Sequence, residues 1–225
     1  MLKKLWLALA FMISILLALL IVGCGGDDDD NGNGNGGSYS ASDYFPLAVG
    51  WSWTYQDSGT YSIDTSSTEI VAIVEIGEQQ YYAMTDDDGD TSYFLIQGGT
   101  VYAYDTEIDS NYLIIPATFG IGDSWIGMNM DSTDTAEMTI THSWMTQETE
   151  VQTTEDITVP AGSFSCLKIL STIEWGYQVS MNDSVLYSSS ETETSYVWVS
   201  KNVGSIKEQS SDENISVLLN YTVGE

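Results

Sequence analysis

Short runs of β-favouring residues, each ended by a turn signal, constrain the fold of this chain most strongly. They begin near residue 44 and recur to residue 223, and no segment after residue 42 has the apolar period of a helix of ordinary length. This pattern predicts an all-β domain. The expected strands are Trp51–Tyr55, Glu69–Ile76, Gln80–Thr85, Ser92–Gln97, Val101–Asp105, Tyr112–Ile115, Ala136–Trp144, Glu148–Val159, Phe164–Trp175, Val179–Tyr187, Thr194–Ser200, Ser205–Gln209 and Ile215–Val223.

Turn chemistry separates these runs at short intervals. Hairpin signals stand at Gly77-Glu78, Asp88-Gly89, Gly98-Gly99 and Asn182-Asp183, and Val159-Pro160-Ala161-Gly162 suits a tight turn. Connections this short join only antiparallel neighbours. Because flat open sheets of so many strands are unusual, we expect an antiparallel meander curled into a half-barrel, a closed barrel or a sandwich.

Aromatic residues alternate with small polar residues along the first expected strand. Trp51, Trp53 and Tyr55 fall on one face, which is typical of a half-buried strand facing a core. The same residues, or Tyr102 and Tyr104, could instead stack on sugar rings or line a cavity for a lipid tail. The sequence favours the core and leaves the two binding roles open.

The N-terminus has the composition of an export signal. Lys3 and Lys4 precede a run of 18 residues from Leu5 to Val22 that are all apolar except Ser14. A spanning helix needs about 20 apolar residues, so a retained helix is the alternative to a cleaved signal peptide.

The end of this run, Ile21-Val22-Gly23-Cys24, resembles the lipobox of bacterial lipoproteins. The resemblance implies that residues 1–23 are removed and that Cys24 receives two acyl chains on its thiol, usually with a third on its amino group. Two or three chains form a durable membrane anchor. Under the enterobacterial sorting rule of this family, Gly25 in place of Asp favours the outer membrane, on its periplasmic or surface face.

Three segments are expected. Residues 1–23 form the signal peptide, residues 24–42 form the lipidated cysteine and a flexible acidic tether rich in Gly and Asn, and residues 43–225 form one β domain. The chain has no Arg, and without Lys3 and Lys4 its formal charge falls from −28 to −30. Such a field repels nucleic acids and anionic lipid headgroups, so neither is expected as a partner, and the membrane is reached through the lipid.

Two interpretations of the acidity compete. Most Asp and Glu alternate with Ser and Thr, as on solvated strand faces. The alternative is divalent cation binding, for which Asp86, Asp88 and Asp90 have alternate spacing suited to calcium. This segment departs from the EF-hand loop, and Asp88-Gly89 is also an ordinary hairpin tip, so no metal ligand is assigned.

Catalysis and cofactor binding are not expected. His142 is the sole histidine, so a triad or a histidine-based zinc site cannot be built around it. Cys166 lies between apolar residues, which is typical of a small buried side chain rather than a reactive thiol.

Three stretches occur in the order seen in poorly characterised bacterial lipoproteins and periplasmic β proteins. They are residues 44–55 (YFPLAVGWSWTY), 159–169 (VPAGSFSCLKI) and 196–207 (YVWVSKNVGSIK), which resemble the patterns YFPL..G..W.Y, VPAG.F.C.K and W....VG.IK. The resemblance implies an all-β fold akin to the open barrels of lipoprotein carriers, and it brings no catalytic residues.

The expected function is that of an anchored envelope lipoprotein that acts as a non-enzymatic binding or scaffold module. A carrier of hydrophobic molecules in an open barrel is one alternative. A calcium-dependent surface adhesin or glycan binder is the other.

Overall fold

The computed structural model describes residues 37–59, 62–136, 139–182 and 184–224. The expected signal peptide, the lipidation at Cys24 and most of the expected tether lie outside these residues. Within the described residues, no helix has the length and apolarity that a transmembrane span requires.

The described chain is almost entirely β structure, as the sequence predicts. One short helix, α2 (Ala41–Tyr44), accompanies the strands. The strands are β1 (Tyr39–Ser40), β2 (Ser52–Ser58), β3 (Ile63–Ile76), β4 (Gln79–Asp86), β5 (Thr91–Gln97), β6 (Thr100–Asp105), β7 (Ser110–Ile115), β8 (Thr118–Phe119), β9 (Ser124–Ala136), β10 (Thr139–Val159), β11 (Gly162–Met181), β12 (Ser184–Ser200), β13 (Gly204–Ser210) and β14 (Ile215–Thr222).

Regular structure begins slightly before the expected domain boundary at residue 43. Tyr39 and Ser40 pair with Phe119 and Thr118 in a two-stranded sheet, and helix α2 follows directly. The Tyr39 ring also contacts the rings of Tyr44 and Phe119. The end of the segment that the sequence assigns to the tether is therefore held against the domain.

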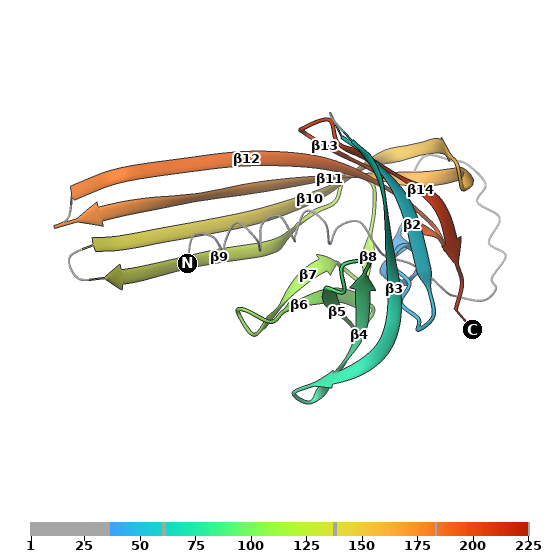
Figure 1. The fold of residues 1–225 in the computed structure, drawn as a ribbon, viewed down its shortest axis with the longest axis horizontal. Coiled ribbons are helices and arrows are strands. Elements are labelled where there is room, and N and C mark those ends of the chain that lie inside the picture. The colour runs from blue at the N-terminus through green and yellow to red at the C-terminus, as the bar shows by residue number, and fades with distance from the viewer. Residues whose placement is uncertain (1–36, 60–61, 137–138, 183, 225) are drawn as a thin grey trace.

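The main sheet has twelve antiparallel strands in the order β7-β6-β5-β4-β3-β2-β14-β13-β12-β11-β10-β9. It consists of two meanders, one from β2 to β7 and the other from β9 to β14. They are joined where β2 pairs with β14. The expected antiparallel meander is confirmed, and the sheet curls until it is nearly closed into a barrel (Figure 1).

The seam of this barrel lies between β7 and β9, which approach each other without forming a ladder. The Trp125 Nε1–H of β9 donates a hydrogen bond of 2.9 Å to the Ile114 carbonyl oxygen of β7. Gly127 lets the two backbones come close, since a Cβ there would lie 2.9 Å from the Leu113 carbonyl oxygen. The Trp125 hydrogen bond thus links the two strands at the seam, and the absence of a side chain at Gly127 allows them to lie close together.

Tight turns reverse the chain where the sequence predicts them. Two-residue loops at Gly77-Glu78, Gly98-Gly99 and Pro160-Ala161 join the strands on either side. Gly98 and Gly99 have φ angles of +60° and +84°, a backbone conformation that fits a hairpin turn and that other residues rarely adopt.

Four strands extend well past the barrel, a feature that the sequence does not reveal. We call this extension the arm; it comprises residues 128–136, 139–147, 173–181 and 184–193, which lie side by side (Figure 1). Strand β10 alone has 21 residues and spans roughly 70 Å at about 3.3 Å per residue. The sequence does not predict strand β9, and it predicts two shorter strands where the structure has β10.

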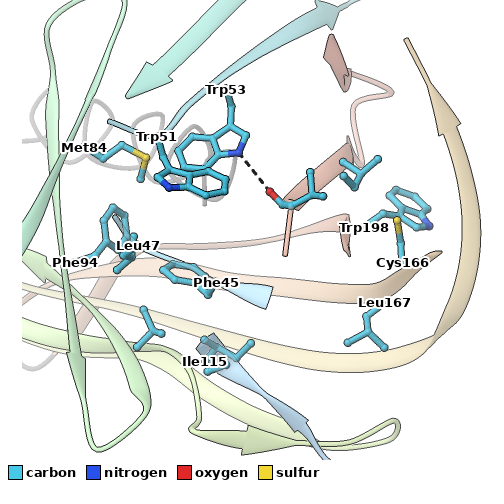
Figure 2. Packing of buried hydrophobic residues seen from close by; sticks show 14 of the residues in the cluster. Phe45, Leu47, Trp51, Trp53, Met84, Phe94, Ile115, Cys166, Leu167 and Trp198 are labelled. Carbon is cyan, nitrogen blue, oxygen red and sulfur yellow. Dashed lines mark hydrogen bonds between the residues drawn. The ribbon is translucent and has the colours of Figure 1, made fainter. Parts of the chain in front are cut away.

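The stacked tryptophans of the core lie on the concave face of the sheet (Figure 2). Trp51 and Trp53 have no exposed surface and stack with ring centroids 5.9 Å apart. Phe45, Leu47 and Phe94 pack around them, as Figure 2 shows. The prediction that the aromatic face of the first expected strand packs into a core is thereby confirmed. The alternative of outward sugar-stacking by Trp51 and Trp53 is wrong, because both rings are enclosed.

Candidate functional site

A cavity of about 230 Å³ lies inside the barrel, beside the aromatic core. Its walls come from the end of helix α2, from β5, β7, β9, β10, β11, β12 and β13, and from the turn that follows β13. The lining residues are Tyr44, Phe45, Phe94, Tyr112, Leu113, Ile114, Ile115, Trp125, Gln147, Thr149, Ile169, Ser171, Ile173, Glu193, Thr194, Ser195, Val197, Val199, Ser205, Glu208, Ser210, Ser211, Asp212 and Asn214.

The width of the curled sheet and the short side chains on its inner face together explain why the protein's own side chains do not fill this space. An eight-stranded barrel is about as wide as its own side chains can fill, so a curled sheet of twelve strands encloses more room. Four small hydroxyl residues also form one row across the inner face. Strand register places Thr149 beside Ser171, Ser171 beside Ser195, and Ser195 beside Ser210.

One side of the cavity is apolar. Ile169 and Val197 sit side by side on β11 and β12, and Phe45, Phe94 and Trp125 complete this wall. Burial of apolar surface stabilises a complex by about 25 cal/mol per Å². The wall can therefore hold a hydrocarbon chain or a ring.

A buried carboxyl group, that of Glu208 on β13, borders this wall, because register places Glu208 beside Val197. Glu208 is 5% exposed, and its Oε2 has no hydrogen-bond partner among the described residues. The neighbouring Ser210 Oγ is likewise buried without a partner. Burial raises the pKa of Glu208 to about 8, and the negative charge of Asp57 adds to this rise.

Further acidic groups flank Glu208. Register places Glu208 beside Ser216 of β14, and Ser216 beside Asp57 of β2. Glu193 and Asp212 line the same cavity, and the pKa of Glu193 is raised by burial and then by the charge of Asp212. The titratable side chains named at this end of the cavity are therefore all acidic.

The described basic residues lie elsewhere, and none of them lines the cavity. Lys168 and Lys207 sit over the Trp198 ring, 5.2 and 4.4 Å from its centroid. Lys168 Nζ is also 3.5 Å from Glu155 Oε1, and Trp198 donates a hydrogen bond of 2.9 Å to Glu155 Oε2. These contacts are on the face of β12 opposite to the cavity-lining Val197, so no cation of the described residues neutralises the buried carboxyl.

The acidic tip at residues 86–90 is built as a hairpin turn. Asp86 Oδ1 accepts hydrogen bonds of 3.0 and 2.9 Å from the backbone N–H groups of Asp88 and Asp90. Asp87 is engaged by the backbone N–H and hydroxyl of Ser67 on β3. Among the described residues, no three His, Cys, Asp or Glu side chains are grouped to hold a metal ion.

The two other residues considered for catalysis lie apart from the cavity. His142 is on the arm, with Nε2 2.9 Å from Asp131 Oδ1 and its ring stacked on Trp144. Cys166 is a buried free cysteine, as the sequence predicts, and burial raises its thiol pKa to about 12.

The sequence interpretation did not find Glu208 or the row of hydroxyl residues. A signal was present: Ile206 and Glu208 alternate on one face of the run from Ser205 to Gln209, and Ser210, the next residue, continues this alternation. Charged and small polar residues at alternate positions are normally taken as a solvated face, and here the curl of the sheet turns that face inward.

Together the fold and the cavity define a nearly closed, antiparallel β-barrel with an internal cavity. The chain belongs to the DUF3108-like family, which matches residues 90–223, more than half of its length. This range contains the second and third of the motif stretches. No curated protein matches the chain.

Two solved structures are similar to it. One is a predicted lipoprotein from Parabacteroides distasonis, with 18% identity and a TM-score of 0.43, where the match covers 79% of this chain and 97% of that one. The other is a predicted exported protein with a YmcC-like fold from Bacteroides fragilis, with 14% identity and a TM-score of 0.39, covering 80% and 99%.

Proposed function

We propose that this chain is a lipid-anchored, non-enzymatic envelope protein that binds a small hydrophobic molecule inside its barrel. The observation that carries the proposal is the internal cavity of about 230 Å³ with an apolar wall. Concave, mostly apolar sites with a few convergent polar groups are the usual form of ligand sites. Of the functions that the sequence leaves open, the carrier of hydrophobic molecules fits this feature best.

An apolar strip on the arm supports the same function. Register places Met145 between Met130 and Trp175, and alternation puts Tyr177 and the cavity-lining Ile173 on the same face of β11. The strip therefore continues one wall of the cavity out along the arm. A hydrophobic ligand would follow such a surface on its way to the barrel.

The N-terminal sequence supports the membrane anchoring that the proposal includes. The lipobox-like sequence that ends at Cys24 would tether the barrel to a membrane, with the outer membrane favoured by Gly25. A formal charge of −28 disfavours nucleic acid as a partner. The barrel would thus meet lipid-derived or other apolar molecules at the membrane surface.

The test uses 1-octanol as the probe and isothermal titration calorimetry as the readout. The full-length protein is reconstituted in phosphatidylcholine nanodiscs, and empty nanodiscs provide the blank. Ser195→Leu adds a larger side chain to the cavity wall and should abolish binding. Ser188→Leu, the same change at an exposed position of β12 on the other face, is the matched control and should bind normally.

Specific binding by the original protein and by Ser188→Leu, together with its loss in Ser195→Leu, supports the proposal. Equal heats for all three proteins and the blank would contradict it.

A further inference from the structure

We infer that the ligand of the barrel is an amphipathic amine, with a cationic head at Glu208 and an apolar body along the Ile169 and Val197 wall. The inference rests on the proposed function and adds the chemical class of the ligand. The observation that carries it is a buried carboxyl oxygen of Glu208 that has no hydrogen-bond partner among the described residues.

The first step is the state of Glu208. Its side chain is almost fully enclosed at 5% exposure, lines the cavity, and has Oε2 without a partner among the described residues. Buried polar atoms are paired in nearly all native structures, and an unpaired one is costly. A donor that enters the cavity would remove this cost.

The second step is the sign of charge that the site accepts. Glu193 and Asp212 line the cavity with Glu208, and Asp57 lies two positions across the sheet from it. The tyrosine facing Glu208 from β2, Tyr55, donates its hydroxyl to the Ser205 carbonyl oxygen and is not a cation. Within the described parts of the chain, every charged group around the polar end is therefore acidic, so a cationic head is attracted and a carboxylate or phosphate head is repelled.

The third step is the proton balance. Burial and the charge of Asp57 hold the pKa of Glu208 at about 8, so without a ligand its carboxyl is mostly protonated at pH 7. An alkylammonium head stabilises the ionised carboxylate through a charge-assisted hydrogen bond. Binding would therefore release up to one proton from Glu208 to the solvent, and no covalent bond changes.

The fourth step is the size and nature of the body. A cavity of about 230 Å³ is below the usual range of about 300–1,000 Å³ for drug-sized ligands, so it suits a single short chain or ring. Phe94 and Trp125 line it together with the aliphatic residues, so the body should be apolar. Octylamine combines the cationic head group and the short apolar chain that these four steps indicate.

The experiment compares three eight-carbon probes that differ only in the head group: octylamine, 1-octanol and octanoate. Each is titrated calorimetrically at pH 7 into the full-length protein in phosphatidylcholine nanodiscs, with empty nanodiscs as the blank. The octylamine titration is repeated in buffers of different ionisation enthalpy to count the protons released.

Two variants complete the design. Glu208→Gln removes the carboxylate and keeps the size of the side chain. Glu150→Gln makes the same change at an exposed position of β10 and is the matched control. Circular dichroism of both variants verifies that the β fold is kept.

We expect the order octylamine, then 1-octanol, then octanoate, with the last giving no specific heat. Glu208→Gln should lose octylamine affinity by about tenfold or more, release no proton, and keep its affinity for 1-octanol. Glu150→Gln should behave like the original protein.

Equal binding of octylamine and 1-octanol, or octylamine binding that Glu208→Gln leaves unchanged, overturns the amine inference and leaves the proposed carrier function intact. Failure of all three probes to bind overturns both.

Discussion

Replacing Glu208 should change how the stability of the folded protein depends on pH. A carboxyl whose pKa is raised from 4.5 to about 8 on folding binds its proton more tightly in the folded than in the unfolded state. Its stabilising contribution is present in full below about pH 4.5 and is lost as the pH rises through this window to about 8. Glu208→Gln removes this dependence because the amide does not titrate.

The magnitude follows from the pKa values. One pKa unit corresponds to about 1.4 kcal/mol, so between about pH 5 and pH 7.5 the original protein should lose about 3 kcal/mol of unfolding free energy relative to Glu208→Gln. The raised pKa of Glu193 acts in the same direction and is present in both proteins, so it cancels in the comparison.

The assay is urea unfolding of the full-length protein, followed by tryptophan fluorescence at about pH 5 and pH 7.5. Equal dependence on urea concentration in the two proteins would verify that the variant changes stability alone. The reasoning is refuted if the difference in unfolding free energy between the two proteins is the same at both pH values.

Three other predictions concern the framework around the cavity. Trp53→Ala, which empties a fully buried site, should lower the unfolding free energy by about 3–5 kcal/mol in urea titrations, and a loss below about 1 kcal/mol would contradict its place in the core. Gly127→Ala should cost about 1–3 kcal/mol because its Cβ meets the Leu113 carbonyl oxygen, whereas Gly37→Ala, with nothing within 4 Å, should be neutral; equal effects would argue against the close seam. The Cys166 thiol, at 1% exposure and with a pKa of about 12, should react with a disulfide reagent at neutral pH only after denaturant is added, and rapid labelling of the folded protein would oppose its burial.

The β class, the meander and most turns could be predicted because each leaves a local mark in the sequence. Alternation of Trp51, Trp53 and Tyr55 with polar residues marks a strand with one buried face, and Gly98-Gly99 marks a tight hairpin. These features depend on residues close together in the chain.

The arm and the cavity could not be predicted because each depends on distant strands. Residues 128–136 and 184–193 are rich in Ser, Thr, Asp and Glu and have little apolar alternation, so nothing local indicates long strands there. Thr149, Ser171, Ser195 and Ser210 form one row only through the register of four strands. Closure of the sheet also decides that Glu208 faces inward.

The most direct test of an occupied barrel is a crystal structure of the full-length protein grown with 8-bromo-1-octanol, with the bromine located by its anomalous scattering. We predict a bromine peak inside the barrel, among Trp125, Ile169 and Val197, and no such peak in Ser195→Leu crystals grown in the same way. Bromine found only on the outer surface or along the arm would contradict an interior binding site.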